Sequence, residues 1–151
     1  MQESSFQLIG IQLPEKTINT HGQSNIDCGN LWQQFEKEKV FDQIPNKLSQ
    51  EVLAVYHDYD GDHTQPFAYF IGAKVQPGTA APEGLVSLQI PAQQYQKVTV
   101  QGKMPDCVSS AWQDIWASNI ARSYGADYEV YDERSHDWAK AEVDIYLSVN
   151  S

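Results

Sequence analysis

The sequence predicts an α+β fold in which two pseudo-symmetric β-α-β-β units form an antiparallel sheet with two main helices. Three observations predict it: the order strand, helix, strand, strand occurs twice, short runs of residues match at the same stage of each unit, and a breaker-rich segment separates them. The units are predicted at about 5–76 and about 85–150. Each unit alone would leave a sheet face and a helix face bare, so the two are expected to share one core.

The first unit is predicted from alternating apolar residues bounded by turn residues. Its elements are, in order, a strand at 6–13, a helix at about 25–40, and strands at 51–59 and 67–75. The segment 76–84 is rich in Pro, Gly and Ala and is predicted as the loop between the units. Residues 85–90 alternate before Pro91, which predicts a further edge strand that feeds the second unit.

The second unit repeats this order, with a strand at 96–102, a helix at about 105–120, and strands at 127–133 and 142–149. Its helix is predicted from an apolar face with helical spacing and from Pro105, which suits a first turn. That face consists of Val108, Ala111, Trp112, Ile115 and Trp116.

Two stretches of the first unit match the second residue by residue. Residues 31–35, Leu-Trp-Gln-Gln-Phe, resemble 111–115, Ala-Trp-Gln-Asp-Ile, and residues 53–56, Leu-Ala-Val-Tyr, resemble 128–131, Tyr-Glu-Val-Tyr. Trp32 thereby corresponds to Trp112, and both are predicted to pack between helix and sheet rather than to line a pocket.

Length and composition predict a single folded domain, because 151 residues with 41% hydrophobic and 11% aromatic residues bury one core. The formal charge of −10 repels phosphate backbones, so no direct nucleic-acid binding is expected, and it favours cationic partners. For most of the carboxylates, solubility alone explains the charge. No apolar run spans a membrane and the first residues lack a signal core, so the expected compartment is the cytoplasm.

Motifs for metal binding or catalysis are weak. The segment 57–63, His-Asp-Tyr-Asp-Gly-Asp-His, is dense in possible ligands. A calcium loop requires Gly at its sixth position and Glu at its twelfth, whereas Gly61 is fourth and Tyr69 is twelfth here, so a turn is the simpler interpretation. Cys28 and Cys107 are expected to be reduced thiols. No catalytic residue, metal or cofactor is predicted. Trp138, in a polar loop, is either a lid or an exposed residue.

Glu129 is the most informative acid, because it interrupts a strand of residues that prefer a packed sheet, at the position of Ala54. If its side chain faces the seam between the units, burial penalises its charge unless a cation or donors compensate, so the seam would select cations. Aromatic walls suit lipophilic cations, and the predicted walls are Tyr56, Tyr69, Trp116 and Tyr146. The alternative is that Glu129 faces water and that each aromatic residue only packs in the core.

An ordered set of segments resembles the GyrI-like effector-binding domains, which are fused to DNA-binding segments in many AraC-type and MerR-type multidrug-responsive regulators. The segments are 55–59, Asp62-His63-Thr64, Tyr69, Ile71-Gly72, Met104-Pro105, 111–116, 127–131 and 143–146. The resemblance covers nearly the whole chain. It implies a single effector-binding domain over 1–151 with a central ligand cleft, in which aromatic residues surround an acid that matches Glu129.

The resemblance also frames the expected function. Because the chain begins almost at the first strand, we expect a stand-alone module of the kind carried on integron cassettes, which binds lipophilic, cationic small molecules for sensing or sequestration. Sensing would require a separate regulatory protein. Two alternatives stay open: a small-molecule hydrolase that uses Glu129 and a cleft tyrosine such as Tyr56 or Tyr69, and a gyrase-inhibitor-like protein-interaction module.

Overall fold

The computed structural model describes residues 2–3, 5–19, 23–61, 64–104, 106–135, 137 and 139–149. The first unit comprises β2 (Phe6–Gln12), α1 (Gln23–Lys37), the short helix α2 (Val40–Gln43), β3 (Val52–His57) and β4 (Ala68–Val75). The second comprises β6 (Gln93–Gly102), α3 (Asp106–Trp116), β7 (Asp127–Tyr131), a 3-10 turn (Glu133–Ser135) and β8 (Ala141–Ser148). Edge strands β1 (Gln2–Glu3) and β5 (Val86–Ile90) precede the two units. The predicted α+β repeat is confirmed.

The strands of the described residues form one sheet in the order β1-β6-β8-β7-β3-β4-β2-β5, with every pairing antiparallel. The two units meet where β3 pairs with β7. The predicted edge strand β5 exists, but it pairs with β2 of the first unit, while β1 pairs with β6 of the second. The units therefore exchange their edge strands across the sheet.

The pairing of β3 with β7 places Ala54 directly opposite Glu129. These two residues also correspond in the sequence match between the units, so the local twofold axis passes through this pair. Residues on either side of it are related in the same way, which places Tyr56 and Tyr131 at equivalent distances from the axis. Glu129 thus lies at the centre of the sheet.

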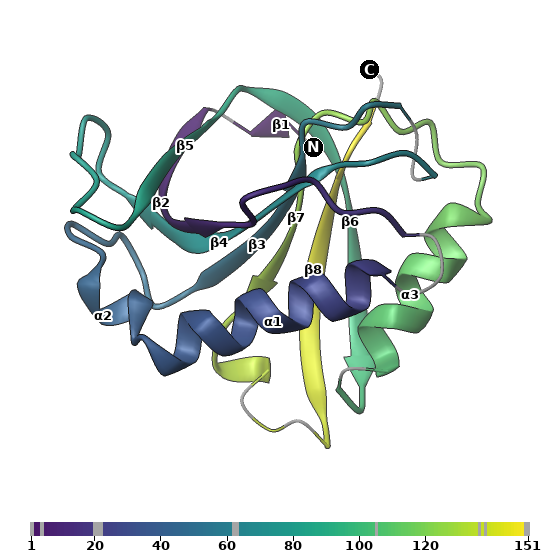
Figure 1. Cartoon of the computed structure of the whole chain (residues 1–151). Coiled ribbons are helices and arrows are strands. Elements are labelled where there is room, and N and C mark those ends of the chain that lie inside the picture. The colour runs from purple at the N-terminus through teal and green to yellow at the C-terminus, as the bar shows by residue number, and fades with distance from the viewer. Residues whose placement is uncertain are drawn as a thin grey trace.

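Helices α1 and α3 lie on the same face of the sheet (Figure 1). Under α1, Leu31 and Phe35 pack with apolar residues of β2 and β4, and under α3, Val108 and Ile115 pack with residues of β6 and β8. The opposite face carries a third cluster, which includes Leu53, Val55, Phe70, Tyr95 and Tyr128. Because strand residues alternate between faces, the odd-numbered residues of β7 point toward the helices.

Several predicted boundaries shift for local reasons. The first helix ends at Lys37 because Lys39 adopts a left-handed φ of 51°, and β3 ends at His57 because Asp58 has a φ of 53°. Helix α3 ends at Trp116 rather than 120, since the Ser118 hydroxyl donates to the Ile115 carbonyl at 2.7 Å. Pro105 lies outside the described residues.

Among the described residues, no helix is long and apolar enough to cross a membrane.

Candidate ligand-binding site

A cavity of about 1020 Å³ lies between the two helices and the centre of the sheet. Its walls come from α1, α3, the strands β3, β4 and β7, and the segments that adjoin them. Of the predicted site residues, Glu129, Tyr56, Tyr69 and Trp116 line this cavity. Glu129, at the centre of the sheet, thus lines the space that residues of both helices also border.

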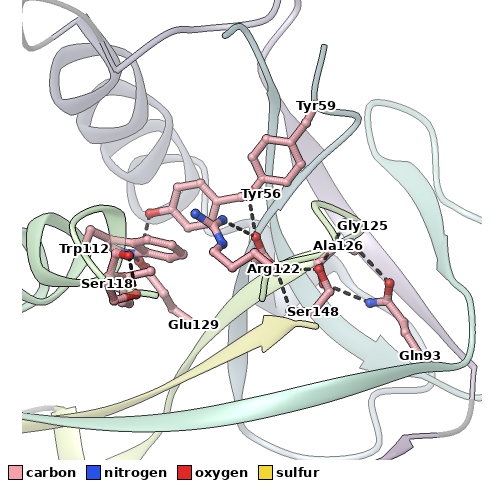
Figure 2. Close-up of polar contacts among 12 residues, drawn as sticks. Tyr56, Tyr59, Gln93, Trp112, Ser118, Arg122, Gly125, Ala126, Glu129 and Ser148 are labelled. Atoms are coloured by element: carbon pink, nitrogen blue, oxygen red, sulfur yellow. Dashed lines mark hydrogen bonds and ion pairs between the residues drawn. The ribbon is translucent and has the colours of Figure 1, made fainter. Parts of the chain in front are cut away.

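Glu129 is 1% exposed and accepts hydrogen bonds from three aromatic side chains. The Tyr56 hydroxyl donates to Oε2 at 2.7 Å, and the Trp112 indole N–H donates to the same oxygen at 2.5 Å. The Tyr131 hydroxyl donates to Oε1 at 2.5 Å. Figure 2 shows Tyr56 and Trp112 beside Glu129. All three contacts use an acceptor on the carboxyl group, which suits its ionised form.

The charge of Glu129 has no basic partner in the described part of the chain, where the ion pairs join other acids to Lys16, Arg122 and Arg134. Burial raises the pKa of Glu129 above its ordinary value, and the three hydrogen bonds oppose that rise. Burial also raises the pKa values of Tyr56 and Tyr131, so both phenols keep their protons and remain donors. Neutral donors therefore hold the Glu129 carboxyl group, and no basic side chain of the described residues lies beside it to compensate its charge.

Aromatic rings enclose the carboxylate. The Tyr56 ring lies 5.0 Å from the Tyr69 ring and 4.8 Å from the Trp112 ring, measured between centroids, and Trp32 lies 5.0 Å from Tyr131. The Trp32 indole N–H donates to the Tyr69 hydroxyl at 2.8 Å. Flat rings around an acid present both area and quadrupole to a bound cation.

Trp32 and Trp112 correct the sequence interpretation, which placed both away from the pocket. Each lines the cavity and donates its indole N–H to a polar group there. The sequence contained a signal for this placement, because the N–H of a buried indole requires a hydrogen-bond acceptor. Since the two tryptophans occupy matching positions of the two units, acceptors near the seam between the units were to be expected.

Tyr146 was predicted as a wall, and the structure places it on the other face of the sheet. It pairs with Tyr128, on whose ring it stacks at 4.9 Å, whereas its neighbour Ile145 pairs with Glu129. Both tyrosines belong to the cluster on the face away from the helices. The prediction failed by one residue of strand register, which exchanges the two faces.

A buried ion pair at the same cavity was not predicted. Asp127 is fully buried, and its Oδ2 accepts from the Arg122 Nη2 at 2.7 Å and from the Tyr59 hydroxyl at 2.6 Å. Its Oδ1 accepts from the backbone N–H and the hydroxyl of Ser148 at 2.7 and 2.8 Å. Arg122 lies in an irregular segment, where no periodic pattern indicates which side chains point inward.

The sequence also contained weaker candidates for a metal site and for catalysis. In the ranges that the structure describes, no group of three or more His, Cys, Asp or Glu residues could hold a metal ion. Asp62 and His63 of the ligand-rich turn, and Trp138, lie outside those ranges.

The hydrolase alternative needs a tyrosine beside Glu129, and Tyr56 meets that requirement. Burial raises the Tyr56 pKa well above its ordinary value, however, which opposes its use as a nucleophile or proton donor.

A sequence relative of the chain is a transcriptional regulator. The chain is 31% identical over 131 residues to the transcriptional regulator BrlR of Pseudomonas aeruginosa; the match covers 80% of this chain and 46% of BrlR, so the chain spans about half of that relative's length. This supports the link to transcription regulators, while the AraC-type connection stays a prediction.

Two solved structures share the fold. An integron cassette protein from the mobile metagenome of Vibrio cholerae superposes with a TM-score of 0.73 at 23% identity, over 99% of this chain and 94% of that one. SAV2435, in a structure with bound tetraphenylphosphonium, superposes with a TM-score of 0.79 at 18% identity, over 100% and 92%. The family model described as "Cass2: Integron-associated effector binding protein" matches residues 1–149. This chain therefore belongs to the Cass2 family of integron-associated effector-binding proteins.

Proposed function

We propose that this protein binds lipophilic organic cations in the central cavity, with Glu129 as the countercharge. The observation that carries the proposal is a buried carboxylate held only by neutral donors inside an aromatic cavity. Such a group costs free energy to bury, and a ligand cation recovers part of that cost when it enters.

The walls define the class of cation. A small inorganic ion would sacrifice its hydration shell in a cavity lined by Tyr56, Tyr69 and Trp116, whereas a cation whose charge is shielded by hydrocarbon has little hydration to lose. The overall charge of −10 draws such ligands toward the protein. The same fold binds tetraphenylphosphonium in SAV2435, which supports this class.

The biological role that follows is an effector-binding module. Binding alone suffices for sequestration of a toxic cation. Sensing requires that a second element of the system, such as a separate regulatory protein, respond to the occupied cavity. Both roles depend on the same cation site and make the same prediction for its affinity.

Calorimetric titration with tetraphenylphosphonium and with tetraphenylborate tests the proposal, because the two ions share a shape and differ in charge. We expect saturable binding of the phosphonium alone. Glu129→Gln should weaken it by about thirtyfold or more, as expected when one partner of a buried charge pair is removed. The matched control is Glu36→Gln, which removes the same charge from an exposed residue at the cavity wall. It should change the affinity by less than about fivefold. Equal affinities of wild type and Glu129→Gln would refute the proposal.

A further inference from the structure

The guanidinium of Arg122 has two buried nitrogens, Nε and Nη1, whose N–H groups have no acceptor among the described residues. Its side chain is 4% exposed and lines the central cavity, and only Nη2 is engaged, by Asp127. Within the described ranges, Nε and Nη1 have no hydrogen-bond partner, and no other buried side-chain nitrogen or oxygen there shares this condition. Buried polar groups are nearly always paired, so an exception in a ligand cavity requires an explanation.

Arg122 is held firmly in this position. Asp127, which anchors it, is itself fixed by Tyr59 and by two hydrogen bonds from Ser148. The guanidinium carbon lies 4.4 Å from the ring centroid of Tyr124 and 5.6 Å from that of Trp112. Ring faces attract the charge, but they do not replace the hydrogen bonds that Nε and Nη1 make in water. The donors are therefore preorganised and unsatisfied.

Trp112 connects this group to Glu129. Its indole N–H donates to the Glu129 carboxylate, while its ring lies beside Arg122, so the two polar groups border one indole in the same cavity. Both residues line the same cavity, so a ligand that fills it lies beside both side chains. The two residues favour different ligand groups, since Glu129 attracts a positive charge and Arg122 offers hydrogen-bond donors to an acceptor.

The charges of Arg122, Asp127 and Glu129 determine which hydrogen-bond acceptor on a ligand suits Arg122. Asp127 already neutralises Arg122, and Glu129 leaves the cavity with an excess negative charge. A second carboxylate from the ligand would meet both acids, whereas a neutral carbonyl oxygen accepts from Nε or Nη1 without that repulsion.

We propose that Arg122 forms a second polar subsite of the Glu129 cavity, so that the preferred ligand is a lipophilic cation that also carries a neutral carbonyl oxygen. This inference rests on the proposed function, because it assigns the ligand class of the same cavity. It distinguishes the expected ligand from a purely hydrocarbon cation such as tetraphenylphosphonium.

The test uses triphenylphosphonium ions that carry an n-alkyl chain, a methyl-ester chain or a carboxylate chain of the same length, over a series of lengths. We expect the best ester to bind wild type about tenfold more tightly than its alkyl counterpart, as expected for a hydrogen bond to a charged group. The carboxylate should bind more weakly than the ester. An ester is less hydrophobic than an alkyl chain, so burial alone predicts the opposite order.

Variants locate the effect. In Arg122→Met/Asp127→Asn the charged pair is replaced by neutral groups, and the Asn carbonyl can still accept from Ser148. In this variant the ester should bind no more tightly than the alkyl ion. Glu129→Gln should weaken both ions and preserve their ratio.

The outcomes separate the two proposals. Equal wild-type affinities for the ester and the alkyl ion at every chain length overturn the Arg122 subsite and leave the cation site standing, as does an ester advantage that persists in the double variant. Absence of binding by both ions overturns the cation site and the subsite together. If the double variant does not fold, the wild-type comparison still decides.

Discussion

Asp127 and Glu129 lie two residues apart on β7, so their side chains leave the same face of the sheet, and both are buried, yet they differ in what surrounds their carboxyl groups. Asp127 is neutralised by Arg122 and receives three further hydrogen bonds. Glu129 receives only neutral donors. The comparison teaches that burial alone does not identify a binding carboxylate. On the proposed function, the identifying feature is a buried carboxyl group that has no cationic side chain beside it.

The largest effect is expected when the ion pair between Arg122 and Asp127 is broken. Arg122→Met leaves the Asp127 charge buried without a cation, so we expect a loss of about 3–5 kcal/mol in the free energy of unfolding. Urea denaturation at neutral pH measures it. Arg122→Met/Asp127→Asn should recover a large part of the loss. A loss below about 1 kcal/mol in the single variant would show that the pair is not a structural element.

A smaller effect distinguishes the donors of the two units. Trp112→Phe removes the indole N–H that Glu129 accepts, and Trp32→Phe removes the one that the neutral Tyr69 hydroxyl accepts. Hydrogen bonds to charged groups are stronger, so we expect a loss of about 1.5–3 kcal/mol for Trp112→Phe and about 1 kcal/mol for Trp32→Phe. Thermal unfolding of both variants side by side measures the difference. Equal losses would indicate that Glu129 is protonated in the folded protein, because both hydrogen bonds would then join neutral groups.

The smallest expected effect concerns the two faces of the sheet. Trp116 lines the cavity, so Trp116→Leu should weaken tetraphenylphosphonium binding by about fivefold through loss of an aromatic wall. Tyr146→Leu removes an aromatic ring from the opposite face of the sheet and should leave the tetraphenylphosphonium affinity of the folded protein unchanged. Titration of both variants at a temperature where each is folded provides the comparison. A larger effect from Tyr146→Leu would contradict the register of β7 and β8.

The sequence predicts the repeated fold well, because periodicity and turn residues act locally. It even identifies the central pair, since the residue match aligns Ala54 with Glu129 and the sheet pairs them. It does not predict that β5 pairs with β2, because an edge strand's partner depends on how the units dock. The end of α3 is missed because a single hydroxyl, that of Ser118, competes for the last carbonyls.

The site divides in the same way. Glu129 is predictable because a charge inside an apolar strand is locally conspicuous. Arg122 is not, because its partner and its burial arise from an irregular segment that folds against β7 and β8. The prediction for Tyr146 was wrong because it depended on one residue of strand register. The prediction for Trp32 and Trp112 was wrong because it considered only apolar packing and not the hydrogen-bond acceptors that their indole N–H groups require.

The most direct test of the central claim is the affinity for tetraphenylphosphonium as a function of pH, in wild type and in Glu129→Gln. Protonation of Glu129 removes the countercharge, and burial raises its pKa above the ordinary 4.5, so wild-type affinity should fall as pH decreases and begin to fall above that value. Below the pKa the loss should approach about tenfold per pH unit. Glu129→Gln should bind weakly at every pH without this dependence. A wild-type affinity that is independent of pH, or a variant that retains the same titration, would contradict Glu129 as the cation-binding group.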